Sequence, residues 1–257
     1  MSVPARTVVR ISVTPVKGFA LIHPDEVELT LDGVVGDRRF LLVDADGKRL
    51  RSSLTAWPIV VSGEYDAAAE RLRLRFPDGA AVEESALGAG PVRTWDLHGG
   101  DVARGRVVEG DWNDRLSALA GHDVRLVRPE TTHGLRDAPV TVVSRASVER
   151  LERQAGGPVD ARRFRMLFDL EGCTEHEEDT WDGRRVRFGD AVLRVGGPVP
   201  RCAATTRDPD SGHRDLDTLR LMKEYRGVRD RVAIDFGVYA SVEQPGRVRV
   251  GDSVEPL

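Results

Sequence analysis

Short runs in which apolar and polar residues alternate recur along most of this chain, and they constrain its fold more than any other feature. The clearest run is residues 71–76, where arginines alternate with large apolar residues. Successive side chains of a strand point to opposite faces of a sheet, so this period of two indicates a half-buried β-strand. The turn signal Asp78-Gly79 follows directly.

The same reasoning predicts strands along the whole sequence. In the first half they are residues 7–13, 26–31, 39–43, 59–65, 71–76, 92–97, 103–108 and 124–127. In the second half they are residues 140–143, 164–170, 186–195 with a break at Gly189-Asp190, 238–242 and 247–250. Many short strands with few helices predict a mainly β (α+β), barrel-like architecture rather than a doubly wound sheet.

Helical spacing of apolar residues occurs in three segments. The first helix is expected at residues 112–120, after Asp111 as N-cap, and Gly121 ends it. Ser144 is expected to cap a second helix, which ends before Gly156. A third is expected at residues 215–225, with Asp215 as its cap. The loop at residues 128–138 separates the halves, so we predict two domains, residues 1–125 and 126–257.

Charge and hydropathy exclude several classes of protein. The chain has 38 basic and 42 acidic residues, a net charge of −4, which argues against a nucleic-acid partner held by bulk electrostatic attraction. The longest uncharged stretch, residues 52–63, is too short for a bilayer, which takes about 20 apolar residues. The N-terminus lacks the apolar core of a signal peptide. We therefore expect a cytoplasmic protein that does not associate with membranes, in which Cys173 and Cys202 are free thiols.

Two segments contain ligand-type side chains without a convincing metal pattern. Residues 173–179 contain a lone C-x-x-H, whereas a structural zinc site needs four ligands, so we predict a solvated acidic loop. Residues 208–212 resemble part of a calcium loop, but the glycine comes one place too early and Leu219 stands where the bidentate Glu should be. We predict a turn there.

The segment at residues 199–212 carries the strongest chemical signal. Cys202 follows Arg201, and a neighbouring cation lowers the pKa of a thiol, whose thiolate form is reactive and binds soft metals. Thr205 and Thr206 offer hydroxyl donors to an anionic partner. The same residues also fit a small thiol buried in a strand, so chemistry alone leaves both interpretations open.

This segment resembles the signature loop of the MOSC superfamily, R-C-x-x-T-T-x-D-P-x-[ST]-G. Further motifs of that superfamily are matched in order along nearly the whole chain, at residues 14–18, 36–44, 142–147, 163–165, 178–181, 237–239 and 250–252. The resemblance implies an N-terminal β-barrel-like domain followed by a MOSC β-barrel with a few helices. It also implies the molybdenum cofactor, a molybdopterin, between the two domains; the superfamily is associated with pyridoxal phosphate binding as well.

The resemblance assigns roles to particular residues. Cys202 matches the cysteine that ligates molybdenum and takes part in catalysis, and Asp179 matches a catalytic acidic residue near the metal, although an ordinary loop carboxylate fits equally. Lys17 and Arg38 match residues that hold the pterin phosphate, a pairing that charge-assisted hydrogen bonds favour. The other expected cofactor-binding residues are Ser144 at a helix start, Arg165, Arg201, Thr205, Thr206 and Asp208.

The chain also departs from the family pattern. Where reductase members have Pro-Asn after the R-F-R element, it has Met166-Leu167, so one polar contact is missing; Gly18 stands where they often have Ser. Two cysteines cannot hold an iron–sulfur cluster, so electrons must come from a separate partner such as a ferredoxin or flavoprotein.

Three functions fit the sequence. The first is a molybdenum-dependent oxidoreductase acting on N-hydroxylated or similar small oxidised substrates. The second is a cofactor carrier or sulfur-transfer module that uses a persulfide on Cys202. The third is a diverged enzyme in which Cys202 is a nucleophile without molybdenum. All three require Cys202 to be accessible, and the first requires it to share a cavity with Lys17 and Arg38.

Overall fold

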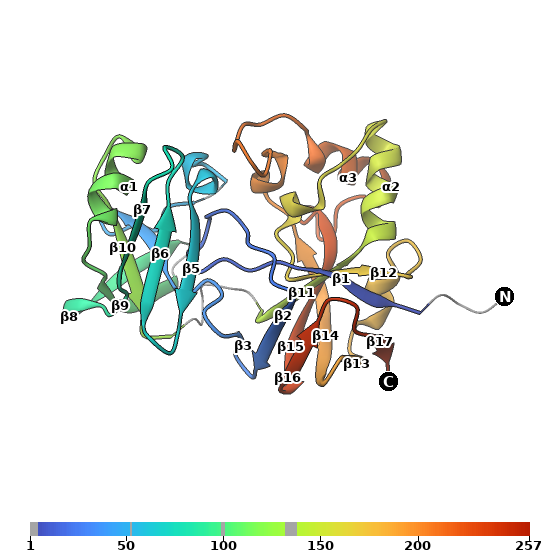
Figure 1. Ribbon diagram of the computed structural model, residues 1–257. Coiled ribbons are helices and arrows are strands. Elements are labelled where there is room, and N and C mark those ends of the chain that lie inside the picture. Colours follow the sequence, from blue (N-terminus) through green and yellow to red (C-terminus); the bar gives the residue numbers. More distant parts are fainter. Residues whose placement is uncertain (1–4, 52, 99–100, 132–137) are drawn as a thin grey trace.

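The structure is a computed structural model that describes residues 5–51, 53–98, 101–131 and 138–257. It forms two lobes side by side, and most of the first half of the chain lies in one lobe and the second half in the other (Figure 1). The protein is mainly β, as predicted.

The second lobe is built on a seven-stranded sheet. In order of neighbours its strands are β1 (Thr7–Ile11), β12 (Phe168–Glu171), β11 (Val140–Ser144), β15 (Asp235–Gln244), β14 (Ala191–Pro200), β13 (Arg185–Phe188) and β17 (Val254–Pro256). The sheet curves until its two edges meet, since the Val254 amide donates to the Arg6 carbonyl (2.8 Å) and Thr7 bridges to Ser253. A nearly closed barrel results, which leaves few unpaired edge groups.

The first strands of the chain complete this second lobe. β1 pairs antiparallel with β12, and β2 (Glu26–Thr30) lies between β16 (Gly246–Arg249) and β3 (Gly33–Val34) in a three-stranded sheet. Val8, Ile11 and Leu29 are fully buried in the barrel core, together with Phe168 and Phe188. The predicted division between residues 125 and 126 stays a prediction.

The first lobe contains two sheets and a helix. Its strands are β4 (Leu41–Asp44), β10 (Val124–Pro129), β9 (Asp101–Val107) and β8 (Ala89–His98) in a four-stranded sheet, and β5 (Ser62–Asp66), β6 (Arg71–Arg75) and β7 (Ala81–Ser85) in a three-stranded one. Leu72 and Leu74 of β6 are fully buried, while Arg71 and Arg75 are exposed. The predicted half-buried strand is confirmed.

Two of the three predicted helices are confirmed at their ends. α1 (Trp112–Ala120) follows Asp111, whose side chain makes no capping hydrogen bond, and ends at Gly121 in the left-handed conformation. α2 (Arg145–Ala155) begins after Ser144, whose hydroxyl accepts from the Ser147 amide, and ends at Gly156, also left-handed. Only glycine adopts that conformation without steric cost.

Two predictions in the second lobe are wrong in detail. α3 (Thr218–Arg226) is capped by Asp217, because the carboxylate of the predicted cap, Asp215, is paired with Arg163 instead. The predicted strand at residues 164–170 begins only at Phe168. The described residues also form short 3-10 helices, namely η1 (Trp57–Val60), η2 (Ala161–Phe164), η3 (Glu177–Trp181) and η4 (Ala203–Thr206).

Three short strands, β3, β7 and β17, had no clear sequence signal. β7 has no fully buried residue, so its sequence shows little alternation between apolar and polar residues. Across the described ranges, no helix is long and apolar enough to cross a lipid bilayer.

Because Leu72 is fully buried in the first lobe, we expect Leu72→Ala to lower the free energy of unfolding by about 2–5 kcal/mol. Leu87 is 58% exposed, so Leu87→Ala should change it by no more than about 0.5 kcal/mol. Urea denaturation of both variants tests this. Equal losses in the two would show that β6 does not anchor the core.

Candidate functional site

A pocket of about 230 Å³ lies where the two lobes meet. The first half of the chain lines it with Lys17, Gly18, Asp37 and Arg38. The second half lines it with residues of η2 and the segment after it, of the end of β14 and of η4, and with parts of β11 and β15. Of the residues predicted for the site, the pocket brings together Lys17, Arg38, Arg165, Arg201, Cys202 and Thr205. Thr206, Asp208, Ser144 and Asp179 do not line it.

Cys202 is exposed in this pocket and forms no disulfide. It follows the end of β14 and occupies the N-cap position of η4. The interpretation as a thiol buried in a strand is therefore wrong. The accessibility that all three proposed functions require is present.

The two threonines after Cys202 fix the shape of η4. The Thr205 hydroxyl donates to the Cys202 carbonyl (3.1 Å) and contacts the Thr218 hydroxyl (2.7 Å). The Thr206 hydroxyl donates to the Ala203 carbonyl (2.8 Å). These hydroxyls were predicted to donate to an anion. In the structure they donate to backbone carbonyls of the protein instead.

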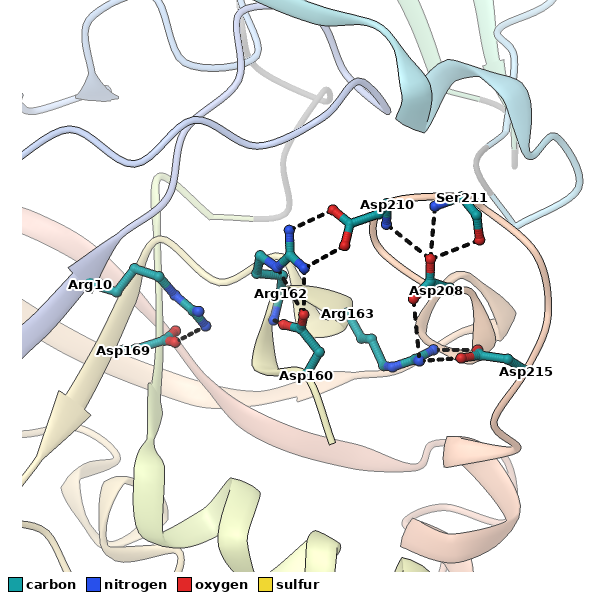
Figure 2. A network of polar contacts seen from close by, with 9 residues as sticks. All are labelled: Arg10, Asp160, Arg162, Arg163, Asp169, Asp208, Asp210, Ser211 and Asp215. Atoms are coloured by element: carbon teal, nitrogen blue, oxygen red, sulfur yellow. Dashed lines mark hydrogen bonds and ion pairs between the residues drawn. The ribbon is translucent and has the colours of Figure 1, made fainter. Parts of the chain in front are cut away.

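Asp208 folds the turn that follows. One carboxylate oxygen accepts from the Ser211 amide (2.8 Å), the Ser211 hydroxyl (2.7 Å) and the Asp210 amide (3.2 Å), as Figure 2 shows. These hydrogen bonds hold the pKa of Asp208 below its usual value. The predicted turn at residues 208–212 is confirmed. Within the described part of the chain, no three His, Cys, Asp or Glu side chains gather in a way that could hold a metal ion.

Two guanidinium groups of the pocket, those of Arg165 and Arg201, have no carboxylate partner among the described residues. Burial lowers the pKa of Arg165 to about 9, with Arg38 adding repulsion, and burial lowers the pKa of Arg201 to about 10. Among the residues that the structure describes, neither forms a salt bridge; Arg165 donates to the Phe19 carbonyl (2.6 Å) and Arg201 to the Phe236 carbonyl (2.8 Å). Desolvated charge without a counter-ion is costly, so the pocket favours an anionic ligand.

Arg38 has a counter-ion that the sequence analysis missed. Its Nη1 donates to the buried carboxylate of Asp37 (2.5 Å), whose other oxygen accepts from the Thr14 amide (2.9 Å). The sequence does contain a signal for this pair, because Asp37 directly precedes Arg38. Lys17 lines the same side of the pocket, and its amide donates to the Phe40 carbonyl (2.9 Å).

Ser144 was expected to offer a helix N-terminus to an anion of the cofactor. The anion there is instead Glu178, whose carboxylate accepts from the Ser144 amide (3.2 Å) and the Ser147 hydroxyl (2.7 Å). Ser144 and Glu178 are both fully buried. The solvated acidic loop predicted at residues 173–179 is therefore wrong at Glu178, because the α2 N-terminus draws this carboxylate inside.

Asp179 lies on η3, beside this buried cluster. Its carboxylate accepts from Arg226 (2.6 Å). The predicted catalytic role of Asp179 thus has no geometric support from the pocket lining and stays a prediction.

The residues that depart from the family pattern give the pocket an apolar wall. Leu167 and Met166 are each 2% exposed, and both line the pocket. Met166 also accepts a hydrogen bond at its sulfur from Arg201 (2.6 Å). A thioether therefore takes part in holding Arg201.

Comparison with known proteins agrees with the motifs. Residues 5–99 match the family model of the MOSC N-terminal beta barrel domain, and residues 129–255 match that of the MOSC domain. The sequence is 26% identical to mitochondrial amidoxime-reducing component 1 of Mus musculus over 280 residues, 96% of this chain and 81% of that protein. For the Homo sapiens protein the identity is 25%, over 96% and 82%. YuaD protein from Bacillus subtilis aligns structurally with a TM-score of 0.44 and 13% identity, over 98% of this chain and 94% of that one.

The His176 imidazole supports a prediction on pH dependence. Burial lowers the pKa of His176 from 6.5 to about 4, and its ring stacks on Tyr225. Between these values the unfolded chain binds more protons than the folded one, so this residue lowers the free energy of unfolding as pH falls. His176→Phe keeps the stacked ring and should weaken the fall between pH 6.5 and 4, measured by chemical denaturation. Parallel profiles for the two proteins would contradict this.

Proposed function

Because this chain belongs to the MOSC family and carries both its N-terminal β-barrel domain and its MOSC domain, we propose that it binds the molybdenum cofactor and acts as an oxidoreductase. Its substrates would be N-hydroxylated or similar oxidised small molecules, in keeping with its distant relation to amidoxime-reducing components. The observation that carries the proposal is the exposed thiol of Cys202 in one pocket with guanidinium groups that lack a carboxylate partner.

The donor groups of the pocket fit this cofactor. The Cys202 thiolate is a soft ligand of the kind that binds such metals. Arg165 and Lys17, on the opposite lobes, suit the phosphate of the pterin, since phosphate at neutral pH carries close to two negative charges. Bound there, the cofactor would supply two-electron chemistry that removes an oxygen atom from the substrate.

The chain's own residues position and shield the ligand. Thr205 fixes η4, and with it the direction in which Cys202 points. Met166, Leu167 and Val199 form apolar wall on the second lobe that limits the entry of water. Removal of one oxygen as water consumes two electrons and two protons, and we propose that a separate ferredoxin or flavoprotein delivers the electrons.

Molybdenum content tests the role of Cys202. The protein is purified from a host supplied with molybdate, and metal per chain is measured for wild type, Cys202→Ala and Cys173→Ala. We expect Cys202→Ala to contain at least about tenfold less molybdenum per chain than wild type, because the variant lacks the only protein ligand proposed. Cys173 does not line the pocket, so Cys173→Ala is the matched control and should keep its metal. Reduction of benzamidoxime with an added electron donor completes the test.

Other outcomes would contradict the proposal. Equal molybdenum in wild type and Cys202→Ala would remove Cys202 as the ligand. A persulfide on Cys202, found by mass spectrometry in a protein without reductase activity, would identify a sulfur-transfer module. Rapid alkylation of Cys202 near neutral pH in a protein that never acquires molybdenum would identify a thiol nucleophile.

A further inference from the structure

The described residues give the two lobes separate hydrophobic cores. Each hydrophobic cluster that they form lies within a single lobe. Two domains are expected to move relative to one another unless the interface between them is large and apolar. The two cavities at this junction measure about 230 and 210 Å³, below the range of about 300–1,000 Å³ that is usual for small-molecule sites. The junction must therefore widen before a bulky molecule can occupy it.

On one side of the junction the chain itself connects the lobes. It passes from the core of the second lobe to that of the first within residues 13–16, and again within residues 34–40. These two crossings lie side by side, because Val16 forms a β-bridge with Phe40. Covalent bonds hold the lobes together here, so the paired crossings can act as a hinge.

On another side, a hairpin at residues 207–214 reaches from the second lobe to the first. Figure 1 shows it in orange at the top of the second lobe, facing the first lobe. Pro209 and Gly212 are its buried residues. Pro209 lines the smaller of the two cavities together with Ile59 and Val60 of η1. The hairpin therefore spans the junction beside the pocket.

Gly212 brings the backbone of the hairpin against the first lobe. Its φ is +72°, a conformation that residues with a Cβ rarely adopt. A Cβ at this position would lie 2.7 Å from the Ala56 carbonyl oxygen and 2.9 Å from Cγ2 of Ile59. Both distances are too short, so a larger residue at this position would push the hairpin away from η1.

The hairpin is held more strongly to its own lobe than to the first lobe. Arg162 of η2 donates to both carboxylate oxygens of Asp210 (2.7 and 2.8 Å), a bidentate ion pair that Figure 2 shows. Toward the first lobe, Arg207 and Arg214 donate to the neutral Ser53 carbonyl (3.3 and 3.2 Å). These distances exceed the usual N–H···O distance of about 2.9–3.0 Å. If the lobes part, the hairpin therefore stays with the second lobe and releases the first.

We propose that the 207–214 hairpin is a clasp that gates the pocket. Its release from η1 lets the lobes part about the hinge and admits to Cys202 molecules that are too large for the closed pocket. η4 alone separates Cys202 from the hairpin along the chain, and the hinge contains Arg38, so opening moves the two sides of the pocket apart. The inference is independent of the proposed function, because it concerns access to the thiol whatever the thiol binds.

The same geometry predicts that a ligand favours the closed form. Hydrogen bonds from Arg38 to the Arg165 carbonyl and from Arg165 to the Phe19 carbonyl cross the junction inside the pocket, and they break as the lobes part. A ligand that contacts both lobes binds the closed state better, and it therefore shifts the population toward that state.

Alkylation of Cys202 by thiol reagents of two sizes tests the gate. All proteins carry Cys173→Ala, and the rates for pyrenylmaleimide and for iodoacetamide are each divided by the rate for free cysteine. The ratio of the two measures access for the bulky reagent. In wild type this ratio should be at least about fivefold below one, because the open state is a minor population.

Gly212→Ala should raise the ratio at least about fivefold, because the added Cβ displaces the hairpin and raises the open population. The matched control is Gly183→Ala. Gly183 has a φ of +73° and open space around its Cβ position in the described part of the chain, so this variant carries the same backbone strain without the clash. It should keep the wild-type ratio.

A milder variant keeps the test valid if Gly212→Ala does not fold, which thermal melts establish. Arg214→Gln removes a hydrogen bond to Ser53 and should raise the ratio at least about twofold. Arg220→Gln, at an exposed arginine of α3 that pairs with Glu224, is its control and should leave the ratio unchanged.

Two results overturn the proposal. One is a wild-type ratio equal to that of free cysteine, because the closed pocket then excludes nothing. The other is an equal ratio in wild type, Gly212→Ala and Arg214→Gln, because the hairpin then does not limit access. The rates are measured on protein purified without molybdate, so this proposal and the molybdenum site can each fail alone.

Discussion

The pocket depends on two hydrogen bonds between the lobes, one donated by Arg38 to the Arg165 carbonyl and one donated by Arg165 to the Phe19 carbonyl. Arg38 donates to the backbone of the second lobe, and Arg165 donates to the backbone of the first. Both have positive φ, and such conformations persist only where surrounding contacts enforce them. Here the contacts that enforce them are the same ones that close the site.

Electrostatics divides the arginines of the pocket into two kinds. Arg38 and Arg163 have carboxylate partners, so they contribute structure and little net charge. Arg165 and Arg201 have no such partner in the part of the chain that the structure describes, and burial lowers their pKa values. Desolvated charge of this kind is costly without a counter-ion, which favours an anionic ligand. The hydrophobic cores of the two lobes stabilise the fold and offset the cost of these buried charges.

The segment at residues 199–215 shows how the fold exposes the Cys202 thiol. η4 is fixed by hydroxyls, the turn after it by Asp208, and the far end of the segment by the Arg163–Asp215 pair. The side chains of Thr205, Thr206 and Asp208 all form hydrogen bonds within the protein that hold the backbone of this segment in place. The Cys202 thiol, by contrast, is exposed. Substitutions at these positions would alter the direction of the thiol rather than the chemistry of the pocket.

The β-rich architecture, the ends of α1 and α2 and the turn at residues 208–212 could all be predicted from the sequence, because periodicity, capping and turn chemistry act over a few residues. Three features came from tertiary contacts alone: β1 helps to close the barrel of the second lobe, Glu178 occupies the α2 N-terminus, and Asp37 compensates Arg38. The tertiary structure also decided that Asp215 pairs with Arg163 instead of capping α3. These outcomes depend on partners far apart in the chain, and on which charge finds a counter-ion when water is removed, which no local pattern records.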